Sequence, residues 1–265
     1  MSKTNKPEIS VILPSIRPKL LPAFYDSLCK STTRQFELIV VGPYPLPQEL
    51  EQYKNIKYAR DFGNPTRAQN IALLLSEGRI VTWQADDAIM LPGAVDKHVD
   101  LLDEMGNGLK NVVIAKYQEG QIGSAAREKM HPDSYFTVDT TPAASPYLPA
   151  NLWLFNVAFM HREFLEALGG FDAAYEGTWV SQTDLAIRAQ AAGATVKMSG
   201  LPCMVCDHMP GSTGDHQPIE ECQTFYDQPR IQKMYGNPTW QQTIKLDAQI
   251  MNWKLAQTIW TRRFK

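Results

Sequence analysis

Short apolar runs alternate with segments of helical spacing along the first half of the chain. Buried strands are predicted where the runs are rich in β-branched residues: 8–13, 36–41, 56–59 and 79–83. Helices are predicted between and after them: 18–31, 47–53, 64–78 and 92–104. Strands that are separated by helices predict a parallel, right-handed, doubly wound sheet.

The second half of the chain has a less regular pattern, with its helices and strands mixed. Strands are predicted at 112–115, 135–138 and 195–198, and helices at 161–168 and 184–192. The proline-rich stretch 141–149 indicates a loop, and 219–265 is expected to be mostly helical.

Polar side chains follow several of the predicted strands directly. In doubly wound sheets, ligands bind outside the carboxyl ends of the strands. This rule places Ser15, Arg17, Gly42, Asp86 and Asp87 around one crevice. The adjacent carboxylates at 86 and 87 repel each other unless donors or a cation compensate them, and Mg²⁺ or Mn²⁺ suits carboxylate oxygens. A solvated turn before the next helix is the alternative reading of this pair.

Composition excludes several classes of protein. The 265 residues are 44% hydrophobic and 20% charged, which is typical of a globular chain that can bury a core. The formal charge of −2 gives no overall basic field for nucleic acid. Four cysteines are too few for a disulfide scaffold, and no apolar run is long enough for a signal peptide or a transmembrane helix. We therefore expect a cytoplasmic protein without a transmembrane segment.

A set of motifs runs in order from about residue 8 to 210. It comprises Val11–Arg17, Arg67–Ala72, Ser76–Val81, Gln84–Gly93, Asn156–Glu163, Gly169–Asp172 and Asp184–Arg188. In order and spacing, these motifs resemble those of family 2 glycosyltransferases, the inverting enzymes of the GT-A fold. The resemblance implies an α/β, GT-A-like fold with a Rossmann-like, mostly parallel sheet. It also implies one catalytic domain over 1–215, with a nucleotide-binding half (1–110) and an acceptor half (111–215), followed by a helical C-terminal extension over 216–265.

The resemblance implies a nucleotide-sugar donor and assigns residues to it. The implied binding residues are Pro14, Ser15, Arg17, Arg67, Asn70, Asp86 and Asp87. Asp86 would contact the ribose or the sugar, and Asp87 would hold Mn²⁺ or Mg²⁺ on the diphosphate. Such a cation stabilises the negative charge that develops on the leaving group. From the pattern alone, Arg67 and Asn70 can equally lie on an exposed helix face.

A late histidine is the third implied metal ligand. His208 precedes a Gly/Ser-rich stretch, as in the family, and His216 is its rival. Cys203 and Cys206 form a CxxC with both histidines and Cys222 close behind, so a structural zinc site in an interaction module is an alternative. Alternating small apolar side chains in a strand would also explain the two cysteines.

The chain departs from the family pattern at two places. The usual Glu-Asp that supplies the general base is replaced by Ser181-Gln182, and glutamine is no base. Asp184 is the nearest acid and the candidate base, with Glu176 second, although Asp184 can also be a structural residue at a helix start. The usual base-pairing Asp after the 36–41 strand is replaced by Gly42–Pro45, which leaves UDP-sugar as the default donor and Tyr44 as a stacking candidate.

The predicted function is inverting, metal-assisted transfer of a sugar from a nucleotide-sugar to an acceptor hydroxyl. The acceptor can be a glycan, a lipid-linked sugar, a protein or a modified nucleobase. One alternative is a nucleotide-sugar-binding relative that is catalytically impaired because Gln182 replaces the base. Another is a sugar nucleotidyltransferase, which Ser15–Pro18 matches poorly. The segment 253–265 is basic with interleaved aromatic residues, so it is a candidate for peripheral contact with a membrane or partner, or for a helix packed on the domain.

Overall fold

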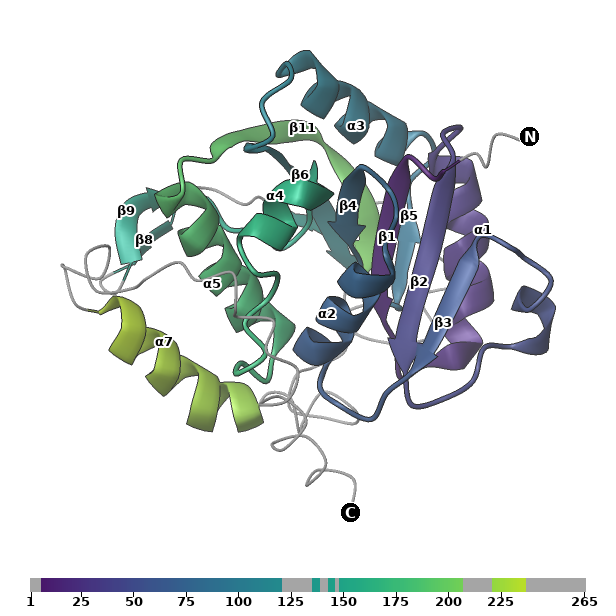
Figure 1. The fold of residues 1–265 in the computed structure, drawn as a ribbon, viewed down its shortest axis with the longest axis horizontal. Coiled ribbons are helices and arrows are strands. Elements are labelled where there is room, and N and C mark those ends of the chain that lie inside the picture. The colour runs from purple at the N-terminus through teal and green to yellow at the C-terminus, as the bar shows by residue number, and fades with distance from the viewer. Residues whose placement is uncertain (1–5, 121–134, 139–142, 146–147, 207–220, 237–265) are drawn as a thin grey trace.

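The computed structural model describes most of the first 206 residues and one later segment. The described ranges are 6–120, 135–138, 143–145, 148–206 and 221–236. Within them, nine strands form one sheet with helices on both faces, and two more strands form a small separate sheet (Figure 1). No helix in these ranges combines the length and apolar character that crossing a bilayer requires.

The strands are β1 (Ile9–Pro14), β2 (Phe36–Gly42), β3 (Ile56–Arg60), β4 (Ile80–Trp83), β5 (Ala88–Met90), β6 (Asn111–Gly120), β7 (Tyr135–Val138), β8 (Ala143–Ser145), β9 (Leu148–Leu152), β10 (Ala158–His161) and β11 (Thr195–Cys206). The helices are α1 (Leu21–Ser31), α2 (Pro65–Leu75), α3 (Ala94–Glu104), α4 (Arg162–Ala167), α5 (Thr178–Ala191) and α7 (Gln228–Tyr235). Short turns of helix are η1 (Pro18–Leu20), η2 (Gln48–Leu50) and the π-helical η5 (Gln223–Asp227).

The main sheet is parallel in its first part and mixed in its second. Its strand order is β3-β2-β1-β4-β10-β6-β11-β5, with β7 on β6. The strands β1 to β4 are mutually parallel, as predicted. Beyond them β11 is parallel to β6, whereas β10 runs antiparallel to both β4 and β6, β5 is antiparallel to β11, and β7 is antiparallel to β6. The predicted α/β fold with its parallel first part is confirmed, and the antiparallel strands make the second part of the sheet mixed.

Two apolar cores cover the two faces of the sheet. In β1, β2 and β6, successive residues point to opposite faces, so each strand supplies both cores. The helices α1 and α3 pack on one face, and α2, α4 and α5 pack on the other (Figure 1). Burial on both faces explains why these strands are continuous apolar runs.

Most of the predicted elements before residue 120 are confirmed, because propensity and capping there agree with packing. Asn64 caps α2 as expected, since its Oδ1 accepts a hydrogen bond from the backbone N–H of Arg67 at 2.7 Å. The observed elements differ from the predicted ones where pairing between segments far apart in sequence determines the structure. The strand β5 was not predicted, β8 lies inside the predicted loop, and β6 continues to Gly120 because β11 and β7 pair with it. The helix α5 begins at Thr178, well before the predicted start, although its first turns are rich in Thr, Trp and Val.

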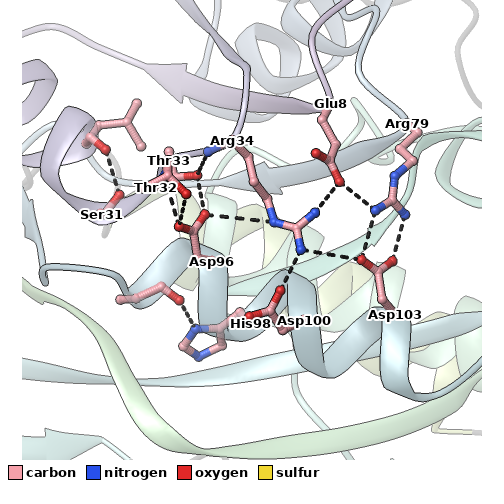
Figure 2. Close-up of polar contacts among 12 residues, drawn as sticks. Glu8, Ser31, Thr32, Thr33, Arg34, Arg79, Asp96, His98, Asp100 and Asp103 are labelled. Carbon is pink, nitrogen blue, oxygen red and sulfur yellow. Dashed lines mark hydrogen bonds and ion pairs between the residues drawn. The ribbon is translucent and has the colours of Figure 1, made fainter.

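An ion-pair network lies at the amino ends of β1 and β4 (Figure 2). Arg34 pairs with Glu8 and with carboxylates of α3, and Arg79 bridges Glu8 and Asp103. Asp96 of α3 also accepts hydrogen bonds from Thr32 and Thr33 after α1. The network joins α1 and α3 to the amino ends of β1 and β4. Its ion pairs are partly exposed, so each contributes little to stability.

The described part of the C-terminal region packs on the domain. The helix α7 lies beside α5 (Figure 1), and Tyr235 joins a small core with Leu152 and Ile187. The division at residue 215 remains a prediction. The basic segment 253–265 lies outside the described residues.

Candidate functional site

A cleft of about 460 Å³ opens at the carboxyl ends of β1, β2 and β4. The strand register causes this, because Pro14 pairs with Val41 and Ile12 pairs with Trp83, so the three strands end at one level. The predicted residues Pro14, Ser15, Arg17, Asp86 and Asp87 all line the cleft. Other lining residues include Asp61, Gln69, Gln84, Tyr117, Glu119, Asn156, Trp179, Gln182 and Gln223.

Asp86 fixes the loop that follows β1. Its Oδ2 accepts hydrogen bonds from the hydroxyl of Ser15 at 2.9 Å and from the backbone N–H groups of Ile16 and Arg17 at 3.2 and 3.1 Å. Its Oδ1 accepts from the Arg17 guanidinium. Asp86 is only 3% exposed, so its charge is satisfied within the protein. Asp86 thus lines the cleft and holds the protein's own loop, and its contact with a ribose or a sugar stays a prediction.

Arg17 also compensates the second carboxylate of the pair. Its guanidinium lies 3.2 Å from Oδ2 of Asp87 and contacts Asp86 at the same time. The cation that two adjacent carboxylates need is thus supplied by the protein. A divalent ion that also binds phosphate oxygens and water needs only one or two protein carboxylates, so the oxygen donors at the cleft fit such an ion through Asp87. Within the described residues, no group of three candidate ligands occurs.

Gly42 makes the loop geometry at the floor of the cleft possible. A Cβ at this position would lie 1.8 Å from the backbone oxygen of Ser15, and the backbone N–H of Ser15 donates to Val41 at 2.9 Å. No side chain fits against a backbone atom at that distance.

We expect Gly42→Ala to push the 15–17 loop away from β2 and to lower the free energy of unfolding by about 1–3 kcal/mol, as overpacking does. Urea denaturation measures the loss. Gly200→Ala is the control, because a Cβ there meets no atom within 4 Å. Equal stability of the two variants would contradict the steric argument.

Arg67 and Asn70 lie on α2 but do not line the cleft. Arg67 pairs with Asp61 at 2.9 Å, and Asp61 does line the cleft. Asn70 is 1% exposed, and its amide exchanges two hydrogen bonds with the backbone of Phe171, at 2.7 and 2.9 Å. The structure therefore gives Arg67 a positioning contact with Asp61 and gives Asn70 a contact between α2 and the 169–172 segment.

The Gly169-Gly170 pair makes that segment turn back onto α2. Both glycines have positive φ angles, 83° and 73°, which residues with a side chain rarely adopt. The turn brings Phe171 onto Trp83, with ring centroids 5.2 Å apart in an edge-to-face arrangement. Trp83 in turn donates from its indole N–H to the backbone oxygens of Phe155 and Asn156. The motif thus supports the floor and one wall of the cleft.

Asp184, the candidate base, lies in the core of the second half and not at the cleft. It is 0% exposed, and Oδ2 accepts from Arg188 at 2.8 Å while Oδ1 accepts from the hydroxyl of Tyr235 at 2.5 Å. Arg188 also donates to the backbone oxygens of Leu168 and Gly170. Burial raises the pKa of Asp184, and the Arg188 guanidinium opposes the shift. These contacts favour a structural role. Glu176 does not line the cleft either.

The first turns of α5 form one wall of the cleft, and the sequence predicted this helix only from residue 184 onward. Thr178, Trp179 and Gln182 line the cleft from the first turns of α5, and Trp179 is 45% exposed. Asp227 fixes this end, because its carboxylate accepts from the backbone N–H groups of Glu176 and Gly177, both at 2.7 Å. Gln182, which stands where the resemblance implies a general base, is thus part of the cleft lining.

The wall that β6 contributes was missed. Tyr117 and Glu119 lie two apart on one face of β6, and Asn156 lies beside them in the lining. Burial, and then the charge of Glu119, raises the pKa of Tyr117 far above its ordinary value, so its hydroxyl keeps its proton. The carboxyl-end rule would have found these residues had the strand been predicted at its full length.

The histidine and zinc predictions concern residues that are largely outside the described ranges. His208 and His216 both lie there. Cys203 is buried in the first core, and burial raises the pKa of its thiol to about 12. Cys206 is buried in the same core, and this burial agrees with the alternative in which small apolar side chains alternate along a strand.

Amide oxygens without partners mark the floor of the cleft. Oε1 of Gln69 and Oε1 of Gln84 are buried and accept no hydrogen bond within the described part of the chain. Gln69 is 1% exposed, and Gln84 is 6% exposed. Because an unsatisfied buried acceptor is costly, both oxygens are suited to take donors from a ligand in the cleft.

Solved structures of TarS from S. aureus share this fold. TarS 1–349 matches with a TM-score of 0.57 and 16% sequence identity over 76% of this chain and 60% of that chain. The complex of the same fragment with UDP-GlcNAc matches with a TM-score of 0.57 and 17% identity over 80% of this chain. The chain thus spans about 60% of that fragment, and 37% of a longer TarS structure.

No protein-family model matches the sequence, and no curated protein matches it significantly. At identities of 16–19%, the structural likeness establishes the fold. The chain has the predicted GT-A-like α/β fold, which it shares with the TarS structures.

Proposed function

We propose that this protein transfers a sugar from a nucleoside diphosphate sugar to an acceptor hydroxyl, with inversion at the anomeric carbon. One observation carries the proposal: Ser15, Arg17, Asp86 and Asp87 gather in one cleft at the carboxyl ends of β1, β2 and β4. Ligands of open α/β sheets bind at this position. TarS, which shares the fold, has been solved with UDP and with UDP-GlcNAc, and this supports a nucleotide-sugar as the donor.

The residues around the acidic pair suit a diphosphate. Asp86 holds the Ser15–Arg17 loop, and Arg17 places a guanidinium at the cleft, where it can contact phosphate oxygens. A divalent cation, Mn²⁺ or Mg²⁺, would be held by Asp87 and would supply positive charge to the leaving diphosphate. We assign His208 as a further candidate ligand on the sequence alone.

The nucleobase is assigned to the hollow beside the cleft. This hollow, of about 520 Å³, is lined by Ile16, Arg17 and Tyr44 among others. Tyr44 is 56% exposed and offers a ring on which a base can stack. The family usually carries an Asp after β2 that pairs with the nucleobase, and this chain has Gly42–Pro45 there instead. Uridine is therefore taken as the default base.

A second candidate function is nucleotide-sugar binding without efficient transfer. It is favoured by Gln182, which lines the cleft where the family carries its base and which cannot accept a proton at neutral pH. Both functions require the same donor site, so donor binding tests them together, and turnover separates them.

A thermal-shift panel of nucleoside diphosphates, with and without Mn²⁺, tests the donor site. Because a ligand that binds only the folded state stabilises it, a concentration of 100 times Kd adds about 2.7 kcal/mol and raises Tm by several degrees. We expect UDP to raise Tm more with Mn²⁺ than without it, and the nucleoside uridine to have little effect. If no nucleoside diphosphate shifts Tm, the proposed function is wrong.

A further inference from the structure

An inverting transfer needs a base, and the described cleft offers few carboxylates for it. The cleft-lining carboxylates are Asp61, Asp86, Asp87 and Glu119. The first three follow β3 and β4, on the side of the cleft where the diphosphate is proposed. A base must lie on the opposite face of the sugar from the leaving group.

Glu119 and Asp87 both line the cleft, on different strands of the sheet. Ala88, which follows Asp87, pairs on β5 with Cys206 of β11, and Cys206 pairs with Glu119 on β6. Two strand spacings place the backbones of Ala88 and Glu119 about 10 Å apart. A sugar ring fits in that interval, with the diphosphate beside Asp87 at one end and the acceptor beside Glu119 at the other.

The side chains around Glu119 can orient an acceptor. Tyr117, two residues earlier on the same face of β6, lines the cleft beside Glu119 and brings a hydroxyl donor to this wall. The Oδ1 of Asn156 is buried and has no hydrogen-bond partner within the described residues, so it can accept from a hydroxyl group of a bound sugar or acceptor.

We propose that Glu119 is the general base that replaces the acid missing at position 182. The assignment rests on the proposed function. In the reaction, the Glu119 carboxylate takes the proton of the acceptor hydroxyl while the oxygen of that hydroxyl forms a bond to the anomeric carbon. The bond from that carbon to the diphosphate oxygen breaks, and its electron pair leaves with the nucleoside diphosphate.

The test is the hydrolysis of UDP-GlcNAc by the full chain with Mn²⁺, in which water takes the acceptor's place. We expect Glu119→Gln to lower turnover by about 10²–10⁴-fold, the usual contribution of a general base, while calorimetry finds the affinity for UDP-GlcNAc unchanged. Azide has no proton to lose, so it should restore turnover in the variant and give glycosyl azide.

The double variant Q118E/E119Q keeps the charge of β6 but turns the carboxylate to the other face of the sheet. It should be as slow as Glu119→Gln.

Several outcomes would overturn the assignment of Glu119. They are wild-type turnover in Glu119→Gln, activity in the double variant, a parallel loss of donor affinity, and a defect that azide leaves unchanged. A wild-type chain that binds UDP-GlcNAc without hydrolysing it would also overturn it, in favour of binding without transfer. A wild-type chain that binds neither UDP nor UDP-GlcNAc would instead contradict the proposed function.

Discussion

Replacing Asp184 by alanine is expected to lower the free energy of unfolding by about 3–5 kcal/mol, as removal of one partner from a buried ion pair does. Arg188, 2% exposed, would keep its charge in the core without its carboxylate, and the hydroxyl of Tyr235 would lose its acceptor. Urea denaturation of the purified variant measures the loss.

The matched control for Asp184→Ala is Glu166→Ala. Glu166 pairs with Arg162 at the same i,i+4 spacing, but both side chains are partly exposed. Surface pairs of this kind contribute about 0.3–0.5 kcal/mol. If the two variants lost similar stability, the buried network would not be what holds α5 to α7. The double variant Asp184→Leu/Arg188→Met should recover much of the loss, because it leaves no unpaired charge.

The second prediction concerns Asp87→Ala. We expect this variant to lose sugar transfer by at least about 10²-fold, a typical loss when one electrostatic stabiliser of a leaving group is removed. The part of the UDP-dependent Tm shift that needs Mn²⁺ should disappear with it. Arg17 keeps its contacts with Asp86, so the loop after β1 should remain in place and the variant should fold.

Asp100→Ala is the control for Asp87→Ala. Asp100 lies in the network at the opposite end of the strands and its side chain is 57% exposed, so it should affect neither UDP binding nor transfer (Figure 2). Unchanged nucleotide affinity and turnover in Asp87→Ala would remove the donor site from this cleft.

The two predictions separate residues that the sequence motifs present alike. Asp87 and Asp184 both stand in motifs that resemble those of the family, and the resemblance assigns both to the chemistry. Asp87 lies at the cleft because the parallel strand β4 ends at Trp83, a few residues before it, and this could be inferred from the order of the elements. Asp184 sits on a helix, where the direction of a side chain depends on which face the rest of the fold covers. The sequence does not contain that information locally.

The residues that were missed have a related explanation. Tyr117 and Glu119 belong to a part of β6 that exists because β7 and β11 pair with it, and Trp179 belongs to helical turns whose propensity is low. Pairing and docking between segments far apart in sequence override local preference. Cleft residues on such extensions were therefore not predictable from local pattern.

By itself, the sequence determined the α/β class, the parallel set β1–β4 and the crevice at which Ser15, Arg17, Asp86 and Asp87 meet. It could do so because alternation, capping and strand order are local or follow general topological rules. Only the tertiary structure decided that Arg17 neutralises the acidic pair, that Asn70 and Asp184 support the core, and that Glu119 faces the cleft. Those outcomes depend on which distant segments pack together, and burial and charge pairing fix this only in the folded chain.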